Sequence, residues 1–62
     1  MVSTEAIAQS LRGLDFPCTK QDCIDYARQR NASREVIDLL QRMPDRRFDS
    51  MADVWSAIGQ VS

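Results

Sequence analysis

The chain has 62 residues, a net charge of −1 and a hydrophobic fraction of 44%. A chain this short forms one domain and buries only about 60% of its unfolded surface, and its apolar content excludes a disordered protein. No apolar run reaches the ~20 residues that cross a bilayer, and the N-terminus lacks the basic and apolar regions of a signal peptide. We therefore expect a cytoplasmic protein with no membrane partner.

Hydroxyl residues stand before four segments that favour helices. They are Ser3, Thr19, Ser33 and Ser50. Each can accept a hydrogen bond from a free N–H group of the first helical turn, which is the role of an N-cap. Three caps also lie between apolar residues at the spacing of a hydrophobic staple; the pairs are Val2 with Ile7, Cys18 with Cys23, and Ala32 with Ile37. The pattern predicts an all-α fold, a compact bundle of four short helices in a single domain spanning residues 1–62.

The first helix should run from about Thr4 to Arg12, with Ile7, Leu11 and Leu14 as its buried stripe. Gly13 follows it, because glycine takes the positive φ that ends a helix without a side-chain clash.

In the connection to the next helix, Pro17 biases Phe16 away from helical torsions, so we expect an extended Phe16 with its ring in the core and Asp15 in water.

The second helix should begin after Thr19 and end near Arg30, with Asn31 as its left-handed cap. Thr19 and Asp22 form the pattern of a capping box. Its inward face comprises Cys23, Ile24 and Ala27, with Tyr26 at the edge.

The third helix should lie between Ser33 and Pro44 and form the centre of the core. It has the widest apolar stripe of the chain, formed by Val36, Ile37, Leu39, Leu40 and Met43. Loss of Leu40 or Ile37 to alanine should then cost about 2–5 kcal/mol.

The last part of the chain predicts a buried aromatic ring and a fourth helix. Phe48 should lie beneath the bundle, and Ser50 with Asp53 resembles a second capping box. Helical spacing then relates Met51, Val54, Trp55, Ile58 and Val61. No segment alternates with period two, so we expect no strand.

The residue types argue against catalysis. The chain contains no histidine, which removes the commonest general base and the commonest neutral metal ligand. Asp22 and Asp25 are three residues apart and could be an acid–base pair, but solvated carboxylates explain them better. We predict a protein that is not an enzyme, with no catalytic residue, cofactor or metal.

The two cysteines allow several interpretations. Cys18 and Cys23 could be a redox pair, half of a metal site or a disulfide. Their spacing is not that of zinc or thioredoxin-like motifs, and two thiols do not complete a tetrahedral site. As the N′ and N4 residues of the second helix they should touch, so packing is the favoured interpretation, with reduced thiols in the cytoplasm.

The arginines give the alternative function. Residues 26–47 contain six arginines and three acids, and the rest of the chain contains two basic and six acidic residues. Ala27, Asn31, Ile37 and Leu40 fit a helix-turn-helix pattern, although Arg30 falls where that pattern wants an apolar residue. A nucleic-acid-binding module would contact phosphates through Arg28, Arg30 and Arg34, with Arg42, Arg46 and Arg47 nearby.

The favoured hypothesis is a non-enzymatic interaction module that binds another protein or a second copy of itself. A small core gains stability from a partner. Trp55, Met51 and Ile58 of the fourth helix are the possible interaction face.

With these residues in view, the chain resembles the bacterial family Domain of Unknown Function 2795 from about Leu11 to Ile58. The resemblance rests on a set of short motifs: Leu11-Arg12-Gly13-Leu14-Asp15-Phe16-Pro17, Lys20-Gln21-Asp22, Ala27, Ala32, Leu39-Leu40, Met43-Pro44-Asp45-Arg46, Phe48, Ser50 and Asp53-Val54. It implies a compact helical domain, and it implies no reaction and no binding residue. Cys18 and Cys23 stand where the family usually has small or aliphatic residues, which favours packing over a redox role.

Overall fold

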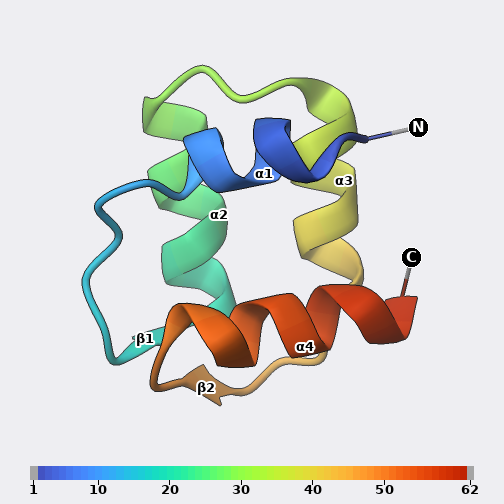
Figure 1. Ribbon diagram of the computed structural model, residues 1–62. Coiled ribbons are helices and arrows are strands. Elements are labelled where there is room, and N and C mark those ends of the chain that lie inside the picture. The colour runs from blue at the N-terminus through green and yellow to red at the C-terminus, as the bar shows by residue number, and fades with distance from the viewer. Residues whose placement is uncertain (1, 62) are drawn as a thin grey trace.

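The computed structural model describes residues 2–61 and contains the four predicted helices (Figure 1). In chain order its elements are α1 (Thr4–Ser10), β1 (Cys18–Thr19), α2 (Lys20–Gln29), α3 (Arg34–Arg42), β2 (Arg47–Phe48) and α4 (Met51–Val61). The predicted starts of all four helices are confirmed. α1 ends at Ser10, two residues earlier than expected, because turns lead from there to Gly13.

The predicted N-caps are present at all four helices. The side-chain oxygens of Ser3, Thr19, Ser33 and Ser50 each accept a hydrogen bond from the N–H group three residues later, at 3.1–3.4 Å. The capping box of α2 is complete, because the Asp22 carboxylate accepts the N–H of Thr19 at 3.0 Å. These bonds satisfy amide groups that the helices cannot pair internally.

The second predicted capping box differs in one contact. The Asp53 carboxylate accepts the N–H of Asp49 at 2.9 Å, one residue before the Ser50 cap. The reciprocal bond therefore fixes the turn that enters α4, and it does not close the box at Ser50 itself.

The prediction of a strand-free, all-α fold is wrong in one detail. β1 and β2 pair as a two-stranded antiparallel sheet, with Cys18 opposite Phe48 and Thr19 opposite Arg47. β1 includes the Thr19 cap of α2, and β2 ends two residues before the Ser50 cap of α4, so the pairing brings the N-terminal ends of α2 and α4 together (Figure 1). Two-residue strands show no period-two pattern, and only the tertiary fold pairs them.

The helices pack around one core as an α2–α3 pair that α1 and α4 cross near its two ends (Figure 1). α2 and α3 contact each other and run in opposite directions, α1 lies across them near one end, and α4 crosses at the other end (Figure 1). A left-handed residue reverses the chain between α2 and α3: Asn31 has φ 59°, and the N–H of Ala32 reaches the carbonyl of Ala27 at 3.0 Å. This is a Schellman motif, and it confirms the predicted role of Asn31.

The core contains residues from all the elements. Its buried hydrophobic residues are Ile7, Leu11, Cys18, Cys23, Ile24, Ala27, Val36, Leu39, Leu40, Met43, Phe48, Val54, Ala57 and Ile58. Phe48 and Leu40 are 0% exposed, as the sequence predicted. Ile37 is only partly buried at the edge of the core, because α3 turns Leu40 and Val36 inward in its place. Within residues 2–61 no helix has the length and hydrophobicity to span a membrane.

Candidate functional site

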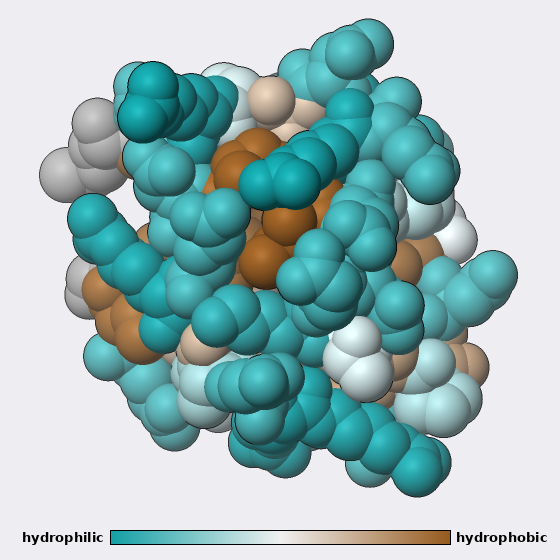
Figure 2. All heavy atoms as spheres, turned by 180° about the vertical axis from the view of Figure 1, so that it is seen from behind, coloured by the Kyte–Doolittle hydropathy of each residue, from teal (hydrophilic) through white to brown (hydrophobic). Residues whose placement is uncertain are grey.

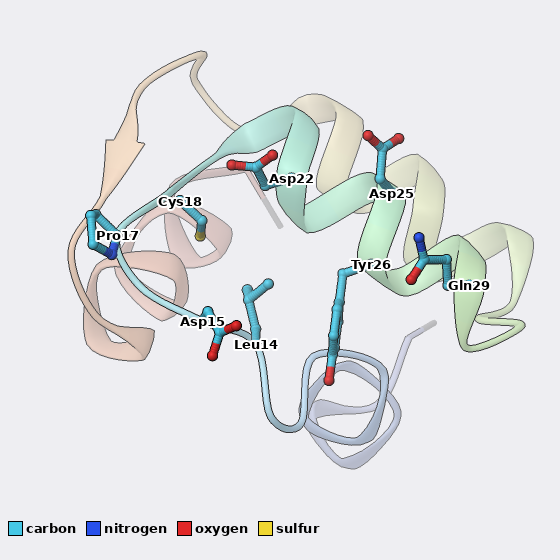
Figure 3. A pocket seen from close by; sticks show the side chains of 8 residues that line it. All are labelled: Leu14, Asp15, Pro17, Cys18, Asp22, Asp25, Tyr26 and Gln29. Atoms are coloured by element: carbon cyan, nitrogen blue, oxygen red, sulfur yellow. The ribbon is translucent and has the colours of Figure 1, made fainter.

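An open cleft lies between the loop that follows α1 and the outer face of α2 (Figure 3). Its volume is about 320 Å³. The residues that line it are Leu14, Asp15, Pro17, Cys18, Asp22, Asp25, Tyr26 and Gln29. The four residues from α2, Asp22, Asp25, Tyr26 and Gln29, stand at positions i, i+3, i+4 and i+7, so one helix face presents all of them.

Tyr26 fixes one end of the cleft by tying α2 to the loop. Its hydroxyl donates a hydrogen bond to the Arg12 carbonyl, which lies in the turn after α1. Gly13 has φ 85°, and a Cβ added there would lie 2.9 Å from the Tyr26 hydroxyl oxygen. Glycine therefore suits this position for two reasons: it adopts the positive φ, and it leaves room for the tyrosine hydroxyl.

Arg30 makes a second link between the same two segments. Its Nε donates to the Gln9 carbonyl at 3.1 Å, and its guanidinium carbon lies 5.6 Å from the centre of the Tyr26 ring. The last carbonyls of any helix lack helical partners. The Gln9 carbonyl of α1 accepts the Arg12 N–H group at 3.4 Å as well as the side chain of Arg30, the C-cap residue of α2, whose positive charge suits the negative end of the α1 dipole.

The lining of the cleft combines apolar and acidic side chains. In Figure 3 Leu14 points between the loop and α2, Pro17 and Cys18 lie at one end, and the Asp25 carboxylate points from α2 away from the loop. The lining includes three aspartates and no lysine or arginine. Asp22 and Asp25 each already accept one hydrogen bond, from the Thr19 N–H and from the Gln21 amide.

The two cysteines contact each other in the core, as the staple pattern predicted. Their Sγ atoms are 3.7 Å apart, and both residues are buried as free thiols. Burial raises the pKa of Cys18 above its ordinary value and raises the pKa of Cys23 to about 12. Thiols with raised pKa values are weak nucleophiles at neutral pH, because the thiolate is the reactive form.

Metal binding finds no support in side-chain geometry. Among residues 2–61 no three side chains of the types that ligate metals come together to form a site. Asp22 and Asp25 were considered above as an acid–base pair. The Asp22 carboxylate accepts the N–H group of the Thr19 cap, and the Asp25 carboxylate accepts the side-chain amide of Gln21. Both residues line the cleft.

The arginines proposed for phosphate contact are exposed, and several have partners in the chain. Arg28 lies on α2, Arg30 follows its last residue, and Arg34 is the first residue of α3. The Arg34 Nε is 3.9 Å from an Asp38 carboxylate oxygen, and the Arg34 side chain is 93% exposed. Arg42 is also exposed at the end of α3.

The arginines around β2 contact their neighbours. The Arg46 guanidinium lies 5.6 Å from the Phe48 ring centre, and Arg47 pairs with Asp49 at 2.9 Å. The helix arrangement also differs from a helix-turn-helix, whose helices cross at about 90–120°, because α2 and α3 lie antiparallel against each other (Figure 1).

The face of α4 proposed from the sequence is smaller than expected. Ile58 is 5% exposed and belongs to the core, whereas Trp55 and Met51 are partly buried against it. Other hydrophobic atoms reach the surface elsewhere: Figure 2 shows a hydrophobic patch framed by hydrophilic side chains on the face opposite to that of Figure 1.

Sequence reasoning did not predict the cleft. The helical spacing of Asp22, Asp25, Tyr26 and Gln29 was visible in the sequence and placed them on one face. Nothing local indicated that the loop carrying Asp15 would fold back along that face.

The fold and the cleft define a small four-helix domain with a short two-stranded sheet. Residues 2–55 match the model of the family described as Protein of unknown function (DUF2795), and the chain belongs to that family. The resemblance noted in the sequence is thereby confirmed. Comparison with curated proteins and with solved structures gave no significant match.

Proposed function

We propose that this chain is a non-enzymatic interaction module that binds another protein through the cleft beside α2. The observation that carries the proposal is an open hollow of about 320 Å³ whose lining combines apolar side chains with three aspartates. Concave sites that place polar groups beside apolar surface are common sites of recognition. Tyr26 and Gly13 hold its wall in place, so the surface is formed before a partner arrives.

The chemistry of the side chains supports binding over catalysis. The sequence offers no histidine, and the two thiols are buried against each other with raised pKa values. The size of the chain adds to this support, because a domain of 62 residues is marginally stable and gains from a bound partner.

Site-specific photo-crosslinking in the native host tests the proposal. A photoreactive residue replaces Gln29, an exposed uncharged residue that lines the cleft, in one variant and Gln41, an exposed residue of α3, in the matched control. We expect a discrete crosslinked protein from the first variant only. Equal crosslinking from both positions, or none from the cleft, would contradict binding at this site.

Sedimentation velocity over a concentration series separates the two kinds of protein partner. A mass that stays at one chain while crosslinks form indicates a different protein. A mass that rises with concentration, and reverts to a single chain when Asp15 is replaced, would indicate a second copy in the cleft.

Nucleic-acid binding is the alternative proposal, and the exposed guanidinium groups favour it. The side chain of Arg34 is 93% exposed on α3, and Arg28 is exposed on the neighbouring α2. A band shift with duplex DNA at low salt tests it, using charge reversal at Arg28 and Arg34 and sparing Arg30, which binds Gln9. Salt-sensitive binding that the reversals abolish would support this alternative, and no shift at low salt would remove it.

A further inference from the structure

We infer that the cleft receives a lysine or arginine side chain from a basic segment of the partner protein. This inference rests on the proposed function and adds to it the chemistry of the partner. It follows from the charge of the lining, from the position of that charge and from the size of the hollow.

The lining carries negative charge on both of its sides. Asp15 comes from the loop, and Asp22 and Asp25 come from α2, while no basic residue lines the cleft. Arg12, Lys20 and Arg28 are close in sequence to lining residues but do not line the cleft. Arg30 binds the Gln9 carbonyl and stacks on Tyr26. A cation that enters the cleft is therefore attracted from the loop and from α2, and a negatively charged side chain is repelled there.

The charge lies beside apolar surface, and this favours a long basic side chain over a small cation. Lysine and arginine bury their methylene stems on apolar surface and keep the charged head at the water boundary. Leu14 and Pro17 offer apolar surface, and Asp15 and Asp22 line the hollow from the loop and from α2 (Figure 3). A small free cation has no methylene stem to bury against Leu14 and Pro17, so this apolar surface would add little to its affinity.

The size of the hollow fits one side chain with its backbone. At about 320 Å³ it lies near the lower limit of the roughly 300–1,000 Å³ that is usual for ligand pockets. A partner helix that lays several apolar anchors into a long groove needs more contact length than the four α2 positions provide. An extended basic segment that inserts a single side chain fits both the volume of the hollow and its short length along α2.

A titration followed by amide NMR shifts tests the inference. The probe is the capped pentapeptide Gly-Gly-Arg-Gly-Gly, with two matched peptides in which citrulline or norleucine replaces arginine. Citrulline keeps the shape of arginine without its charge, and norleucine keeps only the apolar stem. We expect shifts confined to residues 14–29, salt-dependent binding of the arginine peptide, and weaker binding of both neutral peptides.

Two variants with equal net charge locate the charge effect. Asp15→Asn/Asp25→Asn removes two carboxylates from the lining and leaves the Asp22 capping bond in place. Asp38→Asn/Asp45→Asn removes two acids that do not line the cleft. Exposed charge pairs contribute about 0.2–1 kcal/mol each, so the lining variant should bind the arginine peptide about two- to thirtyfold more weakly. The control variant should bind as the parent does.

Each other outcome overturns a distinct claim. Equal binding of the three peptides within the cleft would refute recognition of a cation and leave the interaction module standing. Equal loss in both variants would reduce the effect to net charge and refute the cleft as its origin. Tighter binding of free spermidine than of the arginine peptide would assign the site to a small polyamine and overturn a protein partner. Shifts outside residues 14–29, or none at millimolar peptide, would refute the site, and absent crosslinks from position 29 would then remove the proposed function as well.

Discussion

Replacement of Gly13 by alanine should destabilise the domain by about 2–3 kcal/mol. Gly13 has φ 85°, where a residue with a Cβ pays about 1–2 kcal/mol. The new Cβ would also lie 2.9 Å from the Tyr26 hydroxyl oxygen, so the tyrosine must shift and weaken its bond to the Arg12 carbonyl. A typical hydrogen bond contributes about 0.5–1.5 kcal/mol, so the two contributions add to about 1.5–3.5 kcal/mol, and the expected cost is the middle of that range.

Urea unfolding at equilibrium measures this effect. Far-UV circular dichroism follows the helices, and Trp55 fluorescence follows the packing of α4 against the core. A domain of this size has a total stability of about 3–9 kcal/mol, and its free energy falls by roughly 1 kcal/mol per molar urea. The midpoint of Gly13→Ala should therefore fall by about 2–3 M, with both probes in agreement.

Gly59 supplies the matched control, because the same substitution should act in the opposite direction there. It lies in α4 with no atom within 4 Å of an added Cβ. Alanine is the better helix former by about 0.8–1.0 kcal/mol in a helix interior, so Gly59→Ala should raise the midpoint modestly.

Tyr26→Phe separates the two causes of the Gly13 effect. With the hydroxyl removed, Gly13→Ala should cost only the backbone part, about 1–2 kcal/mol. An unchanged cost in that background would refute the steric contact. A neutral Gly13→Ala in the parent chain would refute the whole explanation.

Three further predictions concern the core, a cap and a thiol. Leu40→Ala should cost about 2–5 kcal/mol and Ile37→Ala clearly less, because only Leu40 is fully buried; chemical denaturation of both variants compares them. Thr19→Ala should cost about 0.5–2 kcal/mol through loss of its bond to the α2 amide, whereas Thr19→Ser should be nearly neutral by thermal unfolding. Cys23 should make the free energy of unfolding fall between about pH 9 and 12, because the unfolded chain releases the thiol proton that the folded chain retains up to a pKa of about 12. Urea titrations at several pH values, with Cys23→Ala as reference, would show this decline, which cannot exceed about 1.4 kcal/mol per pH unit from one proton.

The outcomes that would contradict these three predictions are equally direct. Equal costs at Leu40 and Ile37 would mean that the edge of the core is as closely packed as its centre. A Thr19→Ser variant as unstable as Thr19→Ala would show that the hydroxyl bond contributes nothing. Parallel pH profiles for the parent and Cys23→Ala, or rapid labelling of the folded thiols at neutral pH, would refute a pKa raised by burial.

The helices could be predicted because their signals are local. Ser3, Thr19 and Ser33 accept hydrogen bonds only three residues along the chain, so a short window of sequence contains both partners. Asn31 similarly ends α2 through bonds within the same turn. The contact between Cys18 and Cys23 could be inferred for the same reason, since both residues frame one cap.

The predictions that failed depended on contacts between distant segments. The pairing of Cys18 with Phe48 joins strands too short to show alternation. Ile37 belongs to an apolar stripe wider than the surface that α1, α2 and α4 can cover, and the packing alone decides that it stays at the edge.

The amino-acid sequence by itself determined four helices, their caps and the family, because hydrogen bonds and periodicity act over three or four residues. The tertiary structure alone decided the cleft. Tyr26 holds the turn at Arg12 and Gly13 against α2, and the loop that follows brings Asp15 into the same lining as Asp22 and Asp25. Contacts across fourteen residues depend on the path of the whole chain, and no local pattern records that path.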